Sequence, residues 1–218
     1  KSAVFGYRYT HGGRIYRLIN SVRELRGNMK IAWMLTLSLL FLAGCASGPP
    51  GDPNNICNIL ANEKGWKKDA RKAHKRWGLP PHVGFAFVHR ESTFRARAKP
   101  ERKKLLGVVP TVRPSSAFGY AQATDEAWSD YKKATGRTFV RRNDMGDALD
   151  FIGWYNHTSN KRLGLSKSDA YSLYLAYYSG HGGYARGTWK RSSAIKGYAK
   201  KAAQQAAIYK RQLRRCEV

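Results

Sequence analysis

Apolar residues recur at three- and four-residue steps along the C-terminal part of the chain, with Lys and Arg between them. The stripe begins at Ile195 and continues through Tyr and Ala positions to Leu213 and Cys216. Such spacing places the apolar side chains on one face of a helix and the cations on the other. The pattern predicts a long amphipathic helix whose buried face includes Cys216.

Gly and Pro residues divide the preceding part of the chain into further helices. Helices are predicted over residues 55–77, from 79–81 onward with Pro in the first turn, and over 124–135, 144–156 and 166–178. Residues 166–169 match a capping box for the last of these. The basic, Pro-containing stretch 98–116 is predicted to be a loop, either a solvated insertion or a clamp for an anionic substrate. No strand-rich region is visible, so the predicted fold class is all-α.

The predicted helix after Pro81 carries a carboxyl group on an apolar face. Gly84, Phe87, Val88 and Glu91 fall at i, i+3, i+4 and i+7, with Glu91 at the C-terminal end. Burial and the negative end of the helix dipole would both raise the pKa of this carboxyl, as a general acid near neutral pH requires. The alternative is an ordinary surface glutamate.

The N-terminal part of the chain contains an export signal. Met29-Lys30 is followed by an apolar run over residues 31–42 and then by Leu-Ala-Gly before Cys45. A span would need about 20 apolar residues, so the shorter run favours a secretory signal peptide over residues 29–44. The Leu-Ala-Gly-Cys sequence looks like a bacterial lipobox, in which Cys45 receives lipid. We therefore expect residues 1–28 to be a non-native upstream extension.

Further expectations follow from the lipobox. Residues 45–55, rich in Gly, Pro and Asn, are expected to be a flexible tether to a domain over residues 56–218. Cys45 is followed by Ala46 and not by the Asp that commonly retains lipoproteins at the inner membrane. The expected location is therefore the outer membrane, facing the periplasm, with the lipid as a membrane anchor.

The charge of the chain indicates an anionic partner. The chain has 218 residues, 42% of them hydrophobic, and a formal net charge of +26, which suits one globular domain that binds an anionic polymer or surface. Removal of residues 1–44, which contain seven Lys or Arg and one acidic residue, leaves +20. Both nucleic acid and the bacterial envelope are anionic. The export signal favours the envelope, and no nucleic-acid-binding motif is present.

Two cysteines remain once Cys45 carries lipid. Cys57 and Cys216 lie near the two ends of the predicted domain. An exported chain enters a compartment where disulfides persist, which favours a bond between them over two free buried thiols. The cysteine and histidine spacings match no metal site, so neither a metal nor another cofactor is predicted.

Three short motifs occur in order along the chain: His89-Arg90-Glu91-Ser92, then Gly-Tyr-Ala-Gln at residues 119–122, then Ala-Tyr-Tyr-Ser-Gly at residues 176–180. They resemble the Glu-Ser, Gly-Leu-Met-Gln and Ala-Tyr-Asn-Ala-Gly motifs of SLT-type lytic transglycosylases, which have a lysozyme-like fold. Departures from the family pattern occur at Tyr120, Ala121, Tyr178 and Ser179. The resemblance covers residues 80–190 approximately.

The resemblance implies the chemistry and the site. Glu91 would be the single catalytic acid/base that cuts the β-1,4 bond between N-acetylmuramic acid and N-acetylglucosamine in peptidoglycan, without water, leaving 1,6-anhydro ends. The residues expected to bind substrate are Ser92, Gly119, Tyr120, Gln122 and Tyr177. Two alternatives stay open: a lysozyme-type hydrolase on the same fold, in which an Asp activates water, and a non-catalytic wall-binding lipoprotein.

Overall fold

The structure is a computed structural model that describes residues 51–102, 104–105 and 109–216. The described residues belong to one compact unit, Ser47–Val218. The expected extension 1–28, the signal peptide 29–44 and the lipidation site Cys45 lie outside the described residues. None of the helices in the described part is long and apolar enough to cross a membrane.

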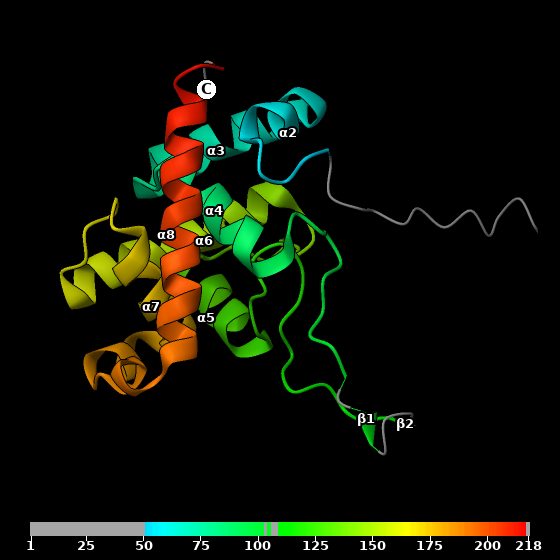
Figure 1. Ribbon diagram of the computed structural model, residues 1–218, viewed down its shortest axis with the longest axis vertical. Coiled ribbons are helices and arrows are strands. Elements are labelled where there is room, and N and C mark those ends of the chain that lie inside the picture. The colour runs from blue at the N-terminus through cyan, green and yellow to red at the C-terminus, as the bar shows by residue number, and fades with distance from the viewer. Residues whose placement is uncertain (1–50, 103, 106–108, 217–218) are drawn as a thin grey trace, which may run out of the picture. The chain divides into compact units, whose positions relative to one another are not determined.

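Helices make up almost all of the regular structure, which confirms the predicted all-α class (Figure 1). In chain order they are α2 (Ile56–Asn62), α3 (Lys64–Trp77), α4 (Pro81–Ser92), α5 (Asp125–Thr135), α6 (Met145–Leu163), α7 (Ala170–Ala185), the 3₁₀ helix η1 (Thr188–Arg191) and α8 (Ser193–Leu213). Two short strands, β1 (Lys104–Leu105) and β2 (Val109–Pro110), pair antiparallel within the predicted loop 98–116. This loop projects away from the helices in Figure 1.

Most predicted helix ends are confirmed by their caps. The Thr124 hydroxyl accepts a hydrogen bond from the Ala127 N–H at the start of α5, and Asp144 caps α6 in the same way. Gly78 and Gly136 end α3 and α5 in the left-handed conformation that glycine adopts most easily. Pro81 occupies the first turn of α4, as predicted.

Four of the predicted helices differ from the prediction in their boundaries. The helix predicted over residues 55–77 is broken at Glu63, because α2 packs on α8 whereas α3 packs on α6. Helix α6 runs to Leu163, seven residues beyond its predicted end. Asp169, and not the start of the predicted capping box, caps α7, which continues past residue 178 to Ala185. Helix α8 ends at Leu213, before Cys216.

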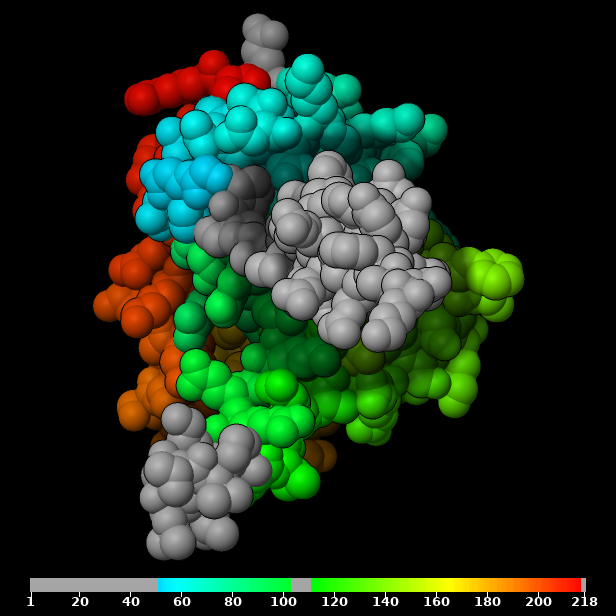
Figure 2. Space-filling view, turned by 90° about the vertical axis from the view of Figure 1, so that its right-hand side faces the viewer, coloured from blue at the N-terminus to red at the C-terminus, as the bar shows by residue number. Residues whose placement is uncertain are grey.

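Helix α4 is the centre of the hydrophobic core. Residues 83–88 are all buried, so this helix is enclosed on every side and not only on the predicted apolar face. Helix α8 packs along one side of it, and α6 and α3 also contact it (Figure 1). Figure 2 shows one face of the unit, with the helices after the described N-terminus (cyan) above segments from the middle of the chain (green).

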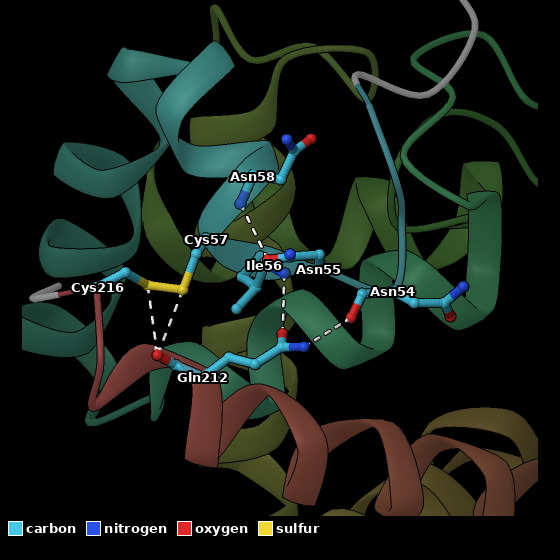
Figure 3. The surroundings of a disulfide bond; sticks show 7 residues. All are labelled: Asn54, Asn55, Ile56, Cys57, Asn58, Gln212 and Cys216. Carbon is cyan, nitrogen blue, oxygen red and sulfur yellow. Dashed lines mark hydrogen bonds between the residues drawn. A yellow bond between two sulfur atoms is a disulfide. The ribbon is translucent and has the colours of Figure 1, made fainter.

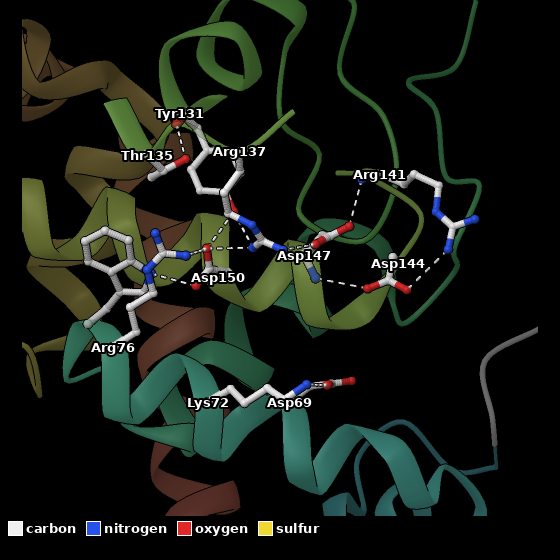
Figure 4. Close-up of polar contacts among 11 residues, drawn as sticks. Asp69, Lys72, Arg76, Tyr131, Thr135, Arg137, Arg141, Asp144, Asp147 and Asp150 are labelled. Carbon is white, nitrogen blue, oxygen red and sulfur yellow. Dashed lines mark hydrogen bonds and ion pairs between the residues drawn. The ribbon is translucent and has the colours of Figure 1, made fainter. Parts of the chain in front are cut away.

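A buried aspartate fastens α6 to α3 and α5 (Figure 4). Both carboxylate oxygens of Asp150 accept hydrogen bonds: Oδ1 from Trp77 Nε1 at 2.8 Å, and Oδ2 from the Tyr131 hydroxyl at 2.6 Å and from Arg76 and Arg137 at 3.1 and 2.9 Å. Removing one partner from such a network leaves a buried charge or donor unsatisfied. Asp150 therefore has a structural role, because its carboxylate is occupied by donors from the domain itself.

The two ends of the domain are joined (Figure 3). Cys57 in α2 and Cys216 after α8 form a disulfide with Cα atoms 5.7 Å apart, which confirms the predicted pairing. Beside it, the Gln212 side chain accepts a hydrogen bond from Ile56 N and donates one to the Asn54 carbonyl. The Tyr209 hydroxyl donates to the Pro53 carbonyl. Pro53 and Asn54, predicted to be part of a flexible tether, are therefore bonded to side chains of α8.

Candidate active site

Glu91 lies in the last turn of α4, at the edge of the hydrophobic core. The helix ends at Ser92, and Thr93 and Phe94 then adopt positive φ angles of 49° and 58°. Phe94 is almost fully buried and stacks on Trp66, with ring centroids 5.8 Å apart. Packing of Phe94 thus holds an unfavourable backbone turn directly after the carboxyl-bearing segment.

The environment of Glu91 suits a general acid. Burial raises the pKa of its carboxyl to about 7, against the opposing effects of a hydrogen bond from Tyr174 and the positive charge of Arg90. A carboxyl with this pKa is half protonated near neutral pH. The sequence predicted the direction of this pKa change, and the structure identifies burial as its main cause.

Tyr174 positions the carboxyl, and sequence reasoning did not identify it. Its hydroxyl donates a hydrogen bond to Glu91 Oε1 at 2.6 Å, which joins α7 to the end of α4. Only 2% of Tyr174 is exposed, so its hydroxyl is fixed by packing. The available signal was its place three residues before Tyr177, since residues three apart share a helix face.

The second motif forms a tight turn whose residues are held by backbone contacts. Gly119 has φ of 80°, and a Cβ there would lie 2.0 Å from the Arg142 carbonyl oxygen. Gln122 Nε2 donates to the carbonyls of Ala98 and Gly119, both at 2.9 Å. Glycine is therefore required at residue 119 for conformation and space, and Gln122 stabilises the turn while it also faces the cleft described below.

The third motif connects the other two. The Tyr177 hydroxyl donates to the Ala121 carbonyl of the second motif at 2.5 Å, and its ring packs edge-on against Phe87 of α4. Gly180, with φ of 71° and ψ of 157°, interrupts the helical backbone of α7. The fold thus brings together three segments that are far apart in the sequence.

An open cleft of about 750 Å³ lies beside this junction, between α5, α6 and α7. Aromatic side chains supply much of its wall: Phe151, Trp154, Tyr155, Tyr177 and Tyr178. Aromatic faces of this kind suit the apolar faces of sugar rings. Glu91 is not among the residues that line the cleft. It is linked to the cleft wall by Tyr177: burial raises the pKa of the Tyr177 hydroxyl, and the nearby negative charge of Glu91 raises it further.

Two of the predicted substrate-binding residues have side chains that contact the protein outside the wall of the cleft. Ser92 is 1% exposed, and its hydroxyl donates to the Val88 carbonyl of its own helix at 3.0 Å. Tyr120 packs edge-on against Trp66, with ring centroids 5.6 Å apart, and is not part of the cleft wall. Both side chains support the fold around the site, and their roles in substrate binding stay predictions.

The described cleft also contains carboxylates and a histidine that were not selected from the sequence. Glu126 and Asp130 of α5 line its wall. His181 stacks on Tyr155 with ring centroids 4.3 Å apart, and burial lowers the pKa of its imidazole. Among the described residues, no group of three or more His, Cys, Asp or Glu side chains could hold a metal ion.

Comparison with known proteins agrees with the three motifs. A search of curated proteins found no match. The profile of the family described as transglycosylase SLT domain matches residues 33–216, which is most of the chain and includes all three motifs. The chain therefore belongs to the transglycosylase SLT domain family, whose members have a lysozyme-like fold.

Proposed function

We propose that this protein is a lytic transglycosylase that cuts the bond between N-acetylmuramic acid and N-acetylglucosamine with Glu91 as its only acid/base. The family supports a lytic transglycosylase role on peptidoglycan glycan strands. The observation that carries the finer proposal is the Glu91 carboxyl, which has a pKa of about 7, accepts a hydrogen bond from Tyr174 and acts electrostatically on Tyr177 in the wall of an aromatic cleft.

The proposed reaction proceeds in two proton transfers. Protonated Glu91 gives its proton to the glycosidic oxygen, the bond from that oxygen to C1 of the muramic acid breaks, and positive charge develops at C1. The Glu91 carboxylate then removes the proton from the 6-hydroxyl of the same sugar. The 6-oxygen bonds to C1 and closes the 1,6-anhydro ring. Glu91 ends protonated, so no water is consumed.

Hydrolysis is the rival reaction, since Glu126 and Asp130 lie in the wall of the cleft and could activate water. Mass spectrometry of sacculus digests separates the two reactions. Anhydro-muramic acid ends are expected from the proposed reaction, and reducing ends would indicate a lysozyme-type hydrolase. Failure of the folded protein to clear sacculi in zymography would favour a non-catalytic wall-binding protein.

Replacing Tyr174 with Phe should shift the pH dependence of the reaction to higher pH. The Tyr174 hydroxyl stabilises the carboxylate form of Glu91, so its removal raises the pKa of Glu91 further above 7. Because the acid must be protonated, kcat/KM falls as pH rises through that pKa. Loss of one hydrogen bond to a charged group should move this limb upward by about one pH unit.

The control for this experiment is Tyr171→Phe, which removes a hydroxyl from the same helix. A pH profile measured on sacculi should be unchanged in this control. An unchanged or downward-shifted limb in Tyr174→Phe would contradict the positioning role of Tyr174.

We also propose that the protein is exported as a lipoprotein anchored through Cys45 in the outer membrane. The Leu-Ala-Gly sequence before Cys45 supports this proposal. Cys45→Ala should abolish incorporation of labelled fatty acid and release the protein from the membrane fraction. Labelling that persists in the variant, or wild-type protein found in inner-membrane vesicles, would contradict the respective part of the proposal.

A further inference from the structure

A second, smaller pocket of about 290 Å³ lies between α4 and α8. Its wall includes His89 and Arg90 of α4, Thr93 directly after that helix, and Lys201, Gln204 and Gln205 of α8. These side chains are cationic or neutral, and among the described residues no carboxylate lines the pocket. We call this site the α4–α8 basic pocket. Its composition suits an anion better than a neutral sugar.

Arg90 forms no salt bridge in the described part of the chain, although its charge acts on the neighbouring Glu91. Its guanidinium lies over the Tyr198 ring, 4.5 Å from the centroid, and its buried Nε atom has no hydrogen-bond partner there. A buried donor of this kind lacks a hydrogen bond that a ligand atom can supply. A ligand anion near the guanidinium would add a hydrogen-bond acceptor and an opposite charge.

The other walls of the pocket add polar donors and a second cation. Lys201 is exposed at the rim, on the same helix as Tyr198. Gln205 is 8% exposed, and its buried Nε2 has no hydrogen-bond partner among the described residues. The Gln205 amide is close enough to the Tyr209 hydroxyl to lower the pKa of that hydroxyl, against the larger effect of burial. Burial and the charge of Arg90 lower the pKa of the His89 imidazole, and the negative charge of Asp52 opposes this effect.

A pair of tyrosines connects this pocket with the cleft. The Tyr198 ring, which makes the cation–π contact with Arg90, packs against Tyr178 with ring centroids 5.7 Å apart. Tyr178 is 52% exposed and belongs to the wall of the cleft. Arg90 is also close enough to lower the pKa of Glu91. A branch on a glycan strand bound at Glu91 could therefore cross Tyr178 and Tyr198 to reach the basic pocket.

We propose that the α4–α8 basic pocket binds a carboxylate of the peptide attached to the peptidoglycan strand. This inference rests on the proposed function. The lactyl carboxyl of muramic acid is consumed in the amide bond to the peptide, so the sugars of a substituted strand are neutral and its negative charges lie on the peptide. The pocket would make the protein prefer peptide-bearing strands over bare glycan.

The test compares Lys201→Gln with Lys200→Gln in the full-length protein. Both residues are exposed on α8, and only Lys201 lines the pocket. The probes are a disaccharide-tetrapeptide and the same compound with its peptide carboxylates amidated. In a binding titration, Lys201→Gln should raise the Kd of the first probe about three- to tenfold and leave the second unchanged, because one charge-assisted contact is lost. Lys200→Gln should match wild type.

Arg90 is not replaced, since a change there would also alter the pKa of Glu91. Equal weakening by both lysine variants would indicate general charge attraction and overturn the pocket. Equal binding of the two probes by the wild-type protein would overturn it as well. The same holds if Lys201→Gln loses binding to anionic phospholipid vesicles but keeps its affinity for the peptide probe. Anhydro-product formation is measured separately on sacculi, so a wild-type protein that binds the probe selectively without cleavage would refute only the proposed function.

Discussion

Replacing Glu91 with Gln is expected to abolish release of anhydro-muropeptides from sacculi. Gln keeps the shape of the side chain and can still accept the hydrogen bond from Tyr174, but it has no proton to donate. General acid catalysis alone contributes about 10²–10⁴ in rate, and here the same carboxyl would also serve as the base for ring closure. The loss should therefore exceed that range, measured by mass spectrometry of digests.

The fold of this variant should survive, and its stability provides the control. The folded-state pKa of Glu91, about 7, lies above the ordinary value of 4.5, so the folded protein holds this proton more tightly than the unfolded chain. Stability therefore falls as pH rises from about 4.5 to about 7 and stays lower above that range. At pH 8, Glu91→Gln should melt no lower than wild type. Near wild-type product release by a folded Glu91→Gln protein would refute the assignment of Glu91.

Loss of the disulfide should give the largest change in stability. The bond joins residues 159 positions apart, so it constrains almost the whole domain in the unfolded state. The chain-entropy model assigns about 4–5 kcal/mol to a loop of this length, as an upper figure. The double variant Cys57→Ser/Cys216→Ser should therefore have a much lower free energy of unfolding by urea titration.

The contacts beside the disulfide set the control for this experiment. Gln212 and Tyr209 hold the same two chain ends together without the covalent bond, so the variant should still fold at low temperature. Cys45 remains unchanged in the double variant, which separates stability from lipidation. An unfolding free energy equal to that of wild type under oxidising conditions would show that the bond does not constrain the unfolded chain as expected.

The sequence by itself determined the helical class and most helix ends, and it supplied Glu91 as the candidate acid/base of the site. Thr124, Asp144, Gly78 and Gly136 act through local backbone geometry, which does not depend on distant residues. The disulfide could be predicted because only two cysteines remained within the expected domain. Glu91 was predicted as the acid/base from the resemblance of the three motifs to SLT-type lytic transglycosylases, because its place on an apolar helical face alone also fits an ordinary surface glutamate.

The tertiary structure alone decided which side chains meet at the site. Tyr174 contacts Glu91 across 83 positions of sequence. Its spacing from Tyr177 places both on one face of α7, but does not show that the Tyr174 hydroxyl reaches the carboxyl. Ser92 follows the catalytic candidate directly, yet the turn of the helix directs its hydroxyl inward. Neighbours in sequence point to different faces of a helix, and residues far apart share a site only when packing brings their helices together.

The break at Glu63 and the basic pocket have the same origin. Periodicity reports that a segment is amphipathic, but it does not identify the helix against which each turn will pack. Helices α2 and α3 separate because they pack on α8 and α6 respectively. Arg90 and Lys201 are two of many cations in the sequence, and only the packing of α4 on α8 places them around one pocket. Local backbone preferences are encoded within a few residues, whereas this pocket depends on contacts between distant segments.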